Sequence, residues 1–218
     1  MKKYFLYFLI LLILTGCNAG DQNSILQNYY YQDGIVIWSN IIFGEDGKDE
    51  SISKLQEMKH VITSSINEFD YASEDISGIY FSTNPGNYHD IQIVKIGEDW
   101  ISIGVIFDSL FTSESIFENI AKPEKVFIEV GSHGRDLRRI ILVNREYGYI
   151  LNGLNSVQDY EKLTYKLESD QKYILYLFSP EYLEFYLQWA VDDIDFQSIP
   201  EQYFHDWAGY VEYEVYDP

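Results

Sequence analysis

The order of apolar and polar positions divides the chain into three parts. An apolar run over residues 4–14 follows two lysines, and the chain turns polar at Asn18. Beyond this point strand-like and helix-like patterns alternate to the C-terminus, and no run of Pro, Gly or Ser is long enough to separate two domains. We therefore predict a polar tether over residues 17–28 and a single globular domain over residues 29–218.

Nine segments are rich in β-branched and aromatic residues or alternate between apolar and polar positions, which is typical of β-strands. They are residues 34–43, 78–82, 91–96, 100–107, 125–130, 139–144, 149–152, 173–178 and 209–216. Side chains two positions apart in a strand point to the same side. In the segment 100–107 we therefore expect the apolar odd-numbered residues, among them Ile103 and Val105, to share one face of the sheet.

Apolar residues at steps of three or four predict helices in other segments. The candidates are residues 50–69, 113–121 and 156–167, and a segment that starts at Ser179-Pro180-Glu181 and would bury Leu183, Leu187 and Val191. A unit of three strands and a helix then occurs twice, near residues 78–121 and 125–168, which is consistent with a duplication. The sum is an α+β fold, a mostly antiparallel sheet with three to four packed helices.

The first 16 residues have the order of an export signal: a positive end, an apolar middle and an exit of small residues. Eleven helical residues span only about 16 Å, against about 30 Å of hydrocarbon in a bilayer. A cleaved signal peptide over residues 1–16 therefore fits better than a transmembrane helix.

The four residues Leu14-Thr15-Gly16-Cys17 resemble the lipobox of bacterial lipoproteins. The resemblance covers only the first 17 residues, and no family is recognised for residues 18–218. It implies cleavage between Gly16 and Cys17, a diacylglycerol on the sulfur of Cys17 and often a further acyl chain, such as palmitate, on the new amine. The alternative is a structural thiol at this position.

Cys17 is the only cysteine in the chain, so the exported domain has no disulfide and no disulfide-linked partner. Two or more acyl chains hold a protein stably on a membrane. We expect a lipid-anchored protein of the bacterial envelope. Asn18, rather than aspartate, resembles the outer-membrane-directed class, which would face the periplasm in a host with two membranes.

The net charge of the chain limits the classes of partner that it can bind. The chain has 15 basic and 35 acidic residues, and loss of the signal peptide removes two lysines, which leaves a net charge of about −22. Such a surface repels nucleic acid and anionic lipid headgroups, so lipid rather than charge must provide the membrane attachment. It favours a basic protein as partner.

Motifs that carry chemistry are not apparent. The acidic stretches 45–50 and 192–195 lack the alternation and final glutamate of a calcium loop, and the four histidines lack the spacing of a zinc site. The turn 131–134 has a serine and a histidine but lies between two strands, unlike the serine turn of hydrolases. We predict no metal site, no cofactor and no enzymatic activity.

Aromatic residues and acids gather near the C-terminus, where tyrosine and tryptophan would provide binding energy and the acids would select a basic partner. The candidate partner-binding residues are Trp207, Tyr210, Glu212, Tyr213, Glu214 and Tyr216. The alternative is that many of these rings belong to the core. Alternation along residues 209–216 also predicts a half-buried strand at a sheet edge.

Two functions follow from these observations. The first is a membrane-anchored acidic domain that binds a protein without catalysis, for example to neutralise a basic toxin. The second is a lipoprotein that binds or hydrolyses cell-wall saccharide, with a carboxylate pair and a stacking tryptophan among Trp100, Trp189 and Trp207.

Overall fold

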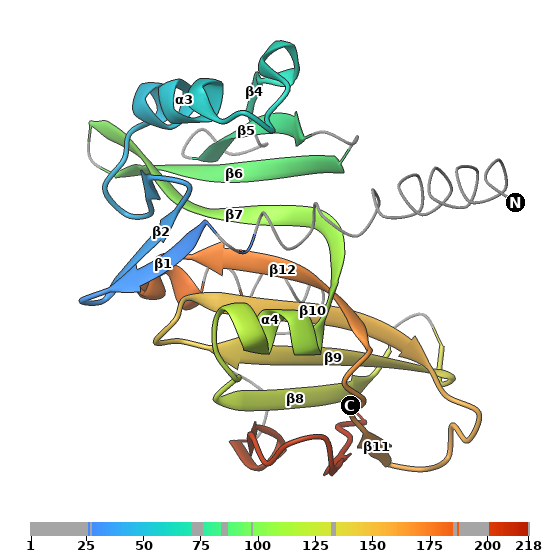
Figure 1. Ribbon diagram of the computed structural model, residues 1–218. Helices are drawn as coiled ribbons and strands as arrows, with labels where there is room; N and C mark the ends of the chain where they lie inside the picture. Colours follow the sequence, from blue (N-terminus) through green and yellow to red (C-terminus); the bar gives the residue numbers. More distant parts are fainter. Residues whose placement is uncertain are drawn as a thin grey trace, which may run out of the picture.

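The described part of the chain is built around one large antiparallel sheet (Figure 1). The computed structural model describes residues 26, 28–70, 76–83, 87–96, 98–131, 134–184, 187 and 201–217. In spatial order, the strands of this sheet are β13 (His205–Asp206), β8 (Lys125–Val130), β9 (Leu137–Asn144), β10 (Tyr149–Ser156), β12 (Lys172–Phe178), β7 (Asp99–Thr112), β6 (Asn87–Ile96), β5 (Ile76–Thr83) and β4 (Asn67–Asp70). Two meanders, one of β4 to β7 and one of β8 to β10 with β12, meet where β12 pairs with β7.

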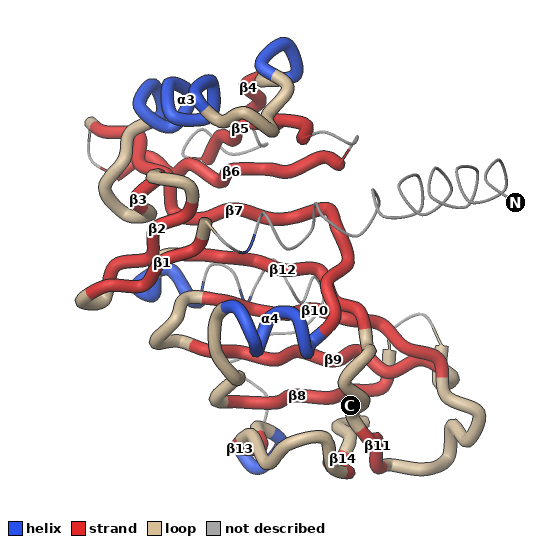
Figure 2. Tube along the Cα trace, viewed as in Figure 1, coloured by secondary structure: helices blue, strands red, loops and turns tan. Residues whose placement is uncertain are grey.

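Smaller elements cover this sheet. They are a three-stranded sheet of β1 (Tyr29–Gln32), β2 (Ile35–Trp38) and β3 (Ile41–Ile42), a two-stranded sheet of β11 (Thr164–Lys166) and β14 (Glu212–Glu214), the helices α3 (Lys48–Glu57) and α4 (Ser113–Asn119), and the short 3-10 helices η1 (Thr63–Ser65), η2 (Pro180–Tyr182) and η4 (Glu201–Tyr203). Figure 2 shows the contrast between the strands, which dominate, and the few helical turns. No helix among these described residues is long and apolar enough to cross a bilayer.

The predicted α+β class with three to four helices is wrong, because the fold is mostly β and the described residues contain two α-helices. The helix predicted over residues 50–69 ends at Glu57, and Met58 is already extended. Val61 then pairs with Thr83, and the amide of Ile62 donates to Ser82 O at 2.8 Å. The later apolar residues therefore pack as extended chain along β5 rather than as a helix face.

The prediction of two units of three strands and a helix is wrong, because only the first unit is followed by a helix. Strands β5, β6 and β7 are followed by α4, and strands β8, β9 and β10 occur as expected. The helix predicted over residues 156–167 is wrong, because β10 runs to Ser156 and the chain reaches β11 through turns. The predicted helix start after Ser179 begins as η2, and Leu183 and Leu187 are buried as expected. Val191, the third apolar residue of that prediction, lies outside the described residues.

A bulge in β7 overturns the predicted strand face. The register with β6 shifts between Gln92 and Ile93, so Ile103 has no Cα partner there. An extra residue in one strand reverses the alternation of side chains beyond it. Ile103 and Val105 therefore lie in different hydrophobic clusters, on opposite faces of the large sheet.

Both faces of the large sheet are covered. The front core, on the side that faces the reader in Figure 1, joins strand residues such as Val105 and Leu175 to Trp38 of β2, Leu55 of α3 and Ile116 of α4. The back core is formed by the strand residues whose side chains point to the other side of the sheet. They pack against Leu183, Leu187, Tyr203 and Phe204 from the chain after β12. This explains why the central strands carry long runs of apolar residues.

The three-stranded sheet is seated on the front core by Trp38, which is fully buried. Its ring lies 5.2 Å from Phe107 of β7 and 5.9 Å from Phe81 of β5. Gly148 allows the same sheet to approach β10 closely, since a Cβ there would lie 2.6 Å from Val36 Cγ2 and 2.2 Å from Phe178 O.

The C-terminal residues cover one edge of the large sheet. β13 pairs with the start of β8, and Tyr216 continues along the same edge, accepting from Val130 N at 2.9 Å and donating to Ile128 O at 2.8 Å. An unpaired strand edge promotes aggregation, so this cover protects the sheet. It also fixes residues 205–217 at the surface.

Candidate functional site

The chain from η4 to β14 surrounds an open hollow of about 500 Å³, which we call the C-terminal hollow. It is lined by Gln202, His205, Asp206, Ala208, Val211, Glu212, Tyr213 and Glu214. Figure 2 shows β14 beside β11, and β13 next to β8, at the end of the large sheet. The hollow therefore lies at the edge of the fold, open to solvent.

Tyr213 holds the wall of the hollow in place. Its ring is only 5% exposed, and its hydroxyl accepts from Ala208 N and donates to Gly209 O, each at 2.9 Å. Gly209 has a φ of +98°, a conformation that favours glycine. His205 packs on the Tyr213 ring with centroids 5.6 Å apart, and its Nε2 lies 3.2 Å from Glu214 O. Burial raises the pKa of the Tyr213 hydroxyl, which therefore stays protonated and keeps donating.

The rim of the hollow is acidic. Asp206 pairs with Lys125 Nζ at 2.6 Å, and Glu212 pairs with Lys162. The hydrogen bond and charge of each lysine lower the pKa of its partner carboxyl, so both carboxylates are ionised at neutral pH. Among the described residues, no cation pairs with the exposed carboxylate of Glu214. The rim thus carries three carboxylates and two paired lysines.

The predicted partner-binding residues are divided between three places. Glu212, Tyr213 and Glu214 line the hollow. Trp207 and Tyr210 instead pack on Phe117 of α4, with ring centroids 5.2 Å and 6.1 Å from it.

Tyr216 lies on the back core, 6.0 Å from the ring of Phe127 and 4.8 Å from the ring of Tyr203. Tyr213 is thus a core residue, and Trp207, Tyr210 and Tyr216 are partly buried against the two cores, in line with the alternative that the sequence left open. The use of this surface by a partner stays a prediction.

Sequence reasoning missed the other residues of the hollow. Asp206 and His205 lie within the aromatic and acidic stretch but are not among the predicted partner-binding residues. Lys125 and Lys162 lie 81 and 50 positions from the acids that they contact. No local signal in the sequence connects such distant positions.

Other candidate chemistry has structural explanations. In the acidic stretch 45–50, Asp46 is buried and accepts from Lys54 Nζ and Ile42 N, both at 2.6 Å. No group of three or more possible metal ligands occurs among the residues that the structure describes. The stretch 192–195, Ser132 and His133 lie outside the described residues.

The N-terminal prediction rests on Gly16 and Cys17, which also lie outside the described residues. Residues 1–18 match the family model for the prokaryotic membrane lipoprotein lipid attachment site, which confirms the lipobox. The chain is an exported protein, anchored by lipid to a bacterial membrane. No curated protein and no solved structure matches the chain.

Proposed function

We propose that this lipoprotein binds a basic protein in the envelope space through the C-terminal hollow and does so without catalysis. The observation that carries the proposal is the acidic rim of Asp206, Glu212 and Glu214 around a turn that Tyr213 holds rigid. A rigid site loses little conformational entropy on binding. A basic toxin that the domain neutralises is one concrete case of such a partner.

The position of the hollow supports this role. β13 is five strands from β7 in the large sheet, which corresponds to about 24 Å at about 4.8 Å per strand. The N-terminal sheet that follows the tether packs on β5 and β7 through Trp38. A partner at the hollow therefore meets little obstruction from the anchored end. In a host with two membranes we expect the outer membrane, with the domain facing the periplasm.

Electrostatics favour binding over hydrolysis at this site. A general acid of a glycosidase needs a raised pKa, whereas the lysine partners lower the pKa of Asp206 and of Glu212. Trp207 packs against α4 and is not among the residues that line the hollow. No observation on the described residues favours the saccharide-binding or hydrolytic alternative.

The test compares two triple variants that remove the same charge. The first, Asp206→Asn with Glu212→Gln and Glu214→Gln, alters the hollow. The control, Asp49→Asn with Glu57→Gln and Asp70→Asn, alters exposed acids of α3 and β4. Lipidated protein is used to capture partners from solubilised envelopes at about 0.1 M and 0.5 M salt. The distance over which charges interact falls about threefold for each tenfold rise in salt, so the higher salt weakens binding that depends on charge.

We expect one basic protein whose recovery falls at least about tenfold with the hollow variant or at high salt, because rim charges set encounter and register. The control variant should retain it. The proposal is wrong if the two triple variants capture the same proteins in the same amounts.

A further inference from the structure

The three-stranded sheet of β1, β2 and β3 carries mainly apolar residues on both faces. Val36, Trp38 and Ile41 point into the front core and are fully buried. The register places Tyr30 opposite Ile37, and Ile37 opposite Ile42, on the other side. Antiparallel sheets with one solvated face normally alternate apolar and polar residues. This sheet departs from that rule.

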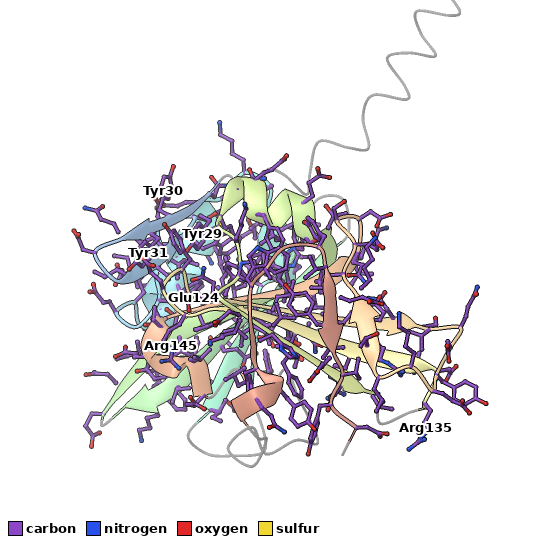
Figure 3. The ribbon with its side chains drawn as sticks, turned by 90° about the horizontal axis from the view of Figure 1, so that it is seen from below. Tyr29, Tyr30, Tyr31, Glu124, Arg135 and Arg145 are labelled. Atoms are coloured by element: carbon purple, nitrogen blue, oxygen red, sulfur yellow. The ribbon has the colours of Figure 1, made fainter. Side chains whose placement is uncertain are left out.

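We define the outer face of this sheet as Tyr30, Gln32, Ile35, Ile37 and Ile42. Gln32, which is exposed and pairs with Ile35, is the one polar residue among these five. Tyr30 is 60% exposed, and the three isoleucines are partly exposed. Figure 3 shows Tyr30 on the outer side of β1 and Tyr29 nearer the body of the domain. The face is rigid, because tight turns with positive φ at Asp33 and Gly34, and at Ser39 and Asn40, join its strands.

Residues 29–43 are also depleted in charge. Asp33, at the tip of the hairpin, is the one charged residue among these fifteen, whereas 23% of the whole chain is charged. In a chain with 35 acidic residues, an apolar surface with so few acids stands apart from the rest. Anionic lipid headgroups would therefore repel this surface less than they repel the acidic surfaces of the domain.

The lipid anchor enters the fold beside this face. Leu26 is 1% exposed in the front core, and Asn28 O accepts from Ser39 N at 2.8 Å, which ties the start of the domain to the β2–β3 turn. Cys17 precedes Leu26 by nine residues, so it lies at most about 31 Å from it at about 3.4 Å per residue. The anchored membrane is thus held within reach of the outer face.

We infer that the outer face of the three-stranded sheet rests on the surface of the membrane that carries the lipid of Cys17. Tyrosine is favoured at the boundary between headgroups and hydrocarbon, and isoleucine gains by leaving water. The contact does not need to provide attachment, because the tether keeps the bilayer at a high effective concentration. Its effect is to orient the domain, and it does not depend on the proposed partner.

The experiment uses the fact that a lipidated Cys17 has no free thiol. A new cysteine is then the only site for a thiol-reactive fluorophore. Tyr30→Cys places the probe on the outer face, and Leu154→Cys is the control, since Leu154 is 55% exposed and shares its strand side with Ile150 of the back core. Lipidated protein is inserted into phosphatidylcholine vesicles that contain a nitroxide-labelled lipid.

We expect the lipid nitroxide to quench the probe at position 30 at least about threefold more than the probe at position 154, with a blue-shifted emission at position 30 only, because the apolar side leaves water. Equal quenching at both positions overturns the inference. The inference is also wrong if, in detergent without lipid, the emission of the probe at position 30 shifts to the blue as the protein concentration rises. A second copy of the chain would then cover the face.

A charge variant tests the same contact without the probe at Tyr30. With the fluorophore on Ile35→Cys, adding Tyr30→Glu should reduce quenching at position 35 to the level of the control, while the lipid keeps the protein on the vesicles. Leu154→Glu in the same background should leave the quenching unchanged. Quenching that is insensitive to Tyr30→Glu contradicts the inference.

Discussion

Each meander of the large sheet buries one basic side chain in the front core, and the two are accommodated in opposite ways. His89 of β6 is 1% exposed and lies 5.2 Å from the rings of both Phe81 and Phe107. Its Nε2 lies 3.1 Å from Thr83 Oγ1, and its Nδ1 has no hydrogen-bond partner among the described residues. Burial, together with the nearby charge of His60, lowers the pKa of His89 to about 4. His89 is therefore neutral at pH 7.

Arg138 of β9 is fully buried and cannot lose its charge. Its guanidinium donates to four carbonyl oxygens. Nη1 reaches Arg135 O at 2.8 Å and Leu137 O at 2.9 Å, and Nη2 reaches Tyr160 O at 3.2 Å and Lys162 O at 3.0 Å. The last two carbonyls belong to the segment after β10 that was expected to be helical.

The comparison bears on why a helix follows β7 but not β10. After β7, Thr112 Oγ1 accepts from Ser115 N and caps α4. After β10, a helix would point the carbonyl of Tyr160 along the helix axis, toward the amide four residues later, rather than toward the guanidinium. Arg138 needs that oxygen, because a buried charge without acceptors is very costly. A histidine can be buried by losing its proton, whereas an arginine requires the chain to be shaped around it.

Removing the guanidinium should have the largest effect. We expect Arg138→Ala to lower the free energy of unfolding by about 3–5 kcal/mol, because it leaves a cavity and buried carbonyls without donors. Urea unfolding measures this loss. Arg135→Ala is the control: Arg135 is exposed, at the margin of the view in Figure 3, and pairs only with Asp217 at the surface, so its loss should be under about 0.5 kcal/mol. Similar losses for the two variants would contradict this role of Arg138.

Lowering the pH should destabilise the protein, because the unfolded chain protonates His89 more readily than the folded chain does. The unfolded chain binds a proton near pH 6.5 and the folded chain only near pH 4, so the free energy of unfolding falls between these values and levels off below them. The loss amounts to about 3 kcal/mol at about 1.4 kcal/mol per pKa unit. Urea unfolding at several pH values gives the free energy of unfolding of the wild type and of His89→Gln. The wild-type value should fall more steeply than that of the variant between pH 6.5 and pH 4. Parallel pH profiles would refute it.

The helix cap of the first meander should have a smaller effect. Thr112→Ala removes the acceptor for Ser115 N, and we expect it to cost about 1 kcal/mol. Thr112→Ser retains the hydroxyl and should restore most of that stability. Thermal unfolding of the two variants measures the difference, and equal stability would show that the cap contributes nothing.

The smallest effect is expected for the side chain of Tyr160. Arg138 contacts only its carbonyl oxygen, and its ring is 52% exposed. Tyr160→Ala should therefore change the free energy of unfolding by less than about 0.5 kcal/mol. A loss near that of Arg138→Ala would mean that the ring, rather than the backbone, holds this segment.

Much of the strand content was predictable because apolar alternation reports local burial. β8 (Lys125–Val130) has the predicted bounds, and β12 (Lys172–Phe178) begins one residue before its predicted start. At the site, alternation correctly separated buried Tyr213 and Val215 from exposed Glu212 and Glu214, but Val211, expected on the buried side, is 41% exposed. The lysines that pair with the rim acids were not predictable, since their contacts are made by strands distant in sequence.

The sequence by itself determined the lipid attachment at Cys17, because processing enzymes act on a linear motif in an exported chain and no tertiary contact is needed. It also determined the alternation of strands such as β14. Only the tertiary structure decided the side taken by Ile103, through a bulge, and the loss of a helix after β10, through Arg138. The bulge arises between two neighbouring strands, whereas the carbonyls that Arg138 contacts lie 22 and 24 positions away. Tertiary contacts outweigh helix and strand propensities, which amount to only about a few tenths of a kcal/mol per residue.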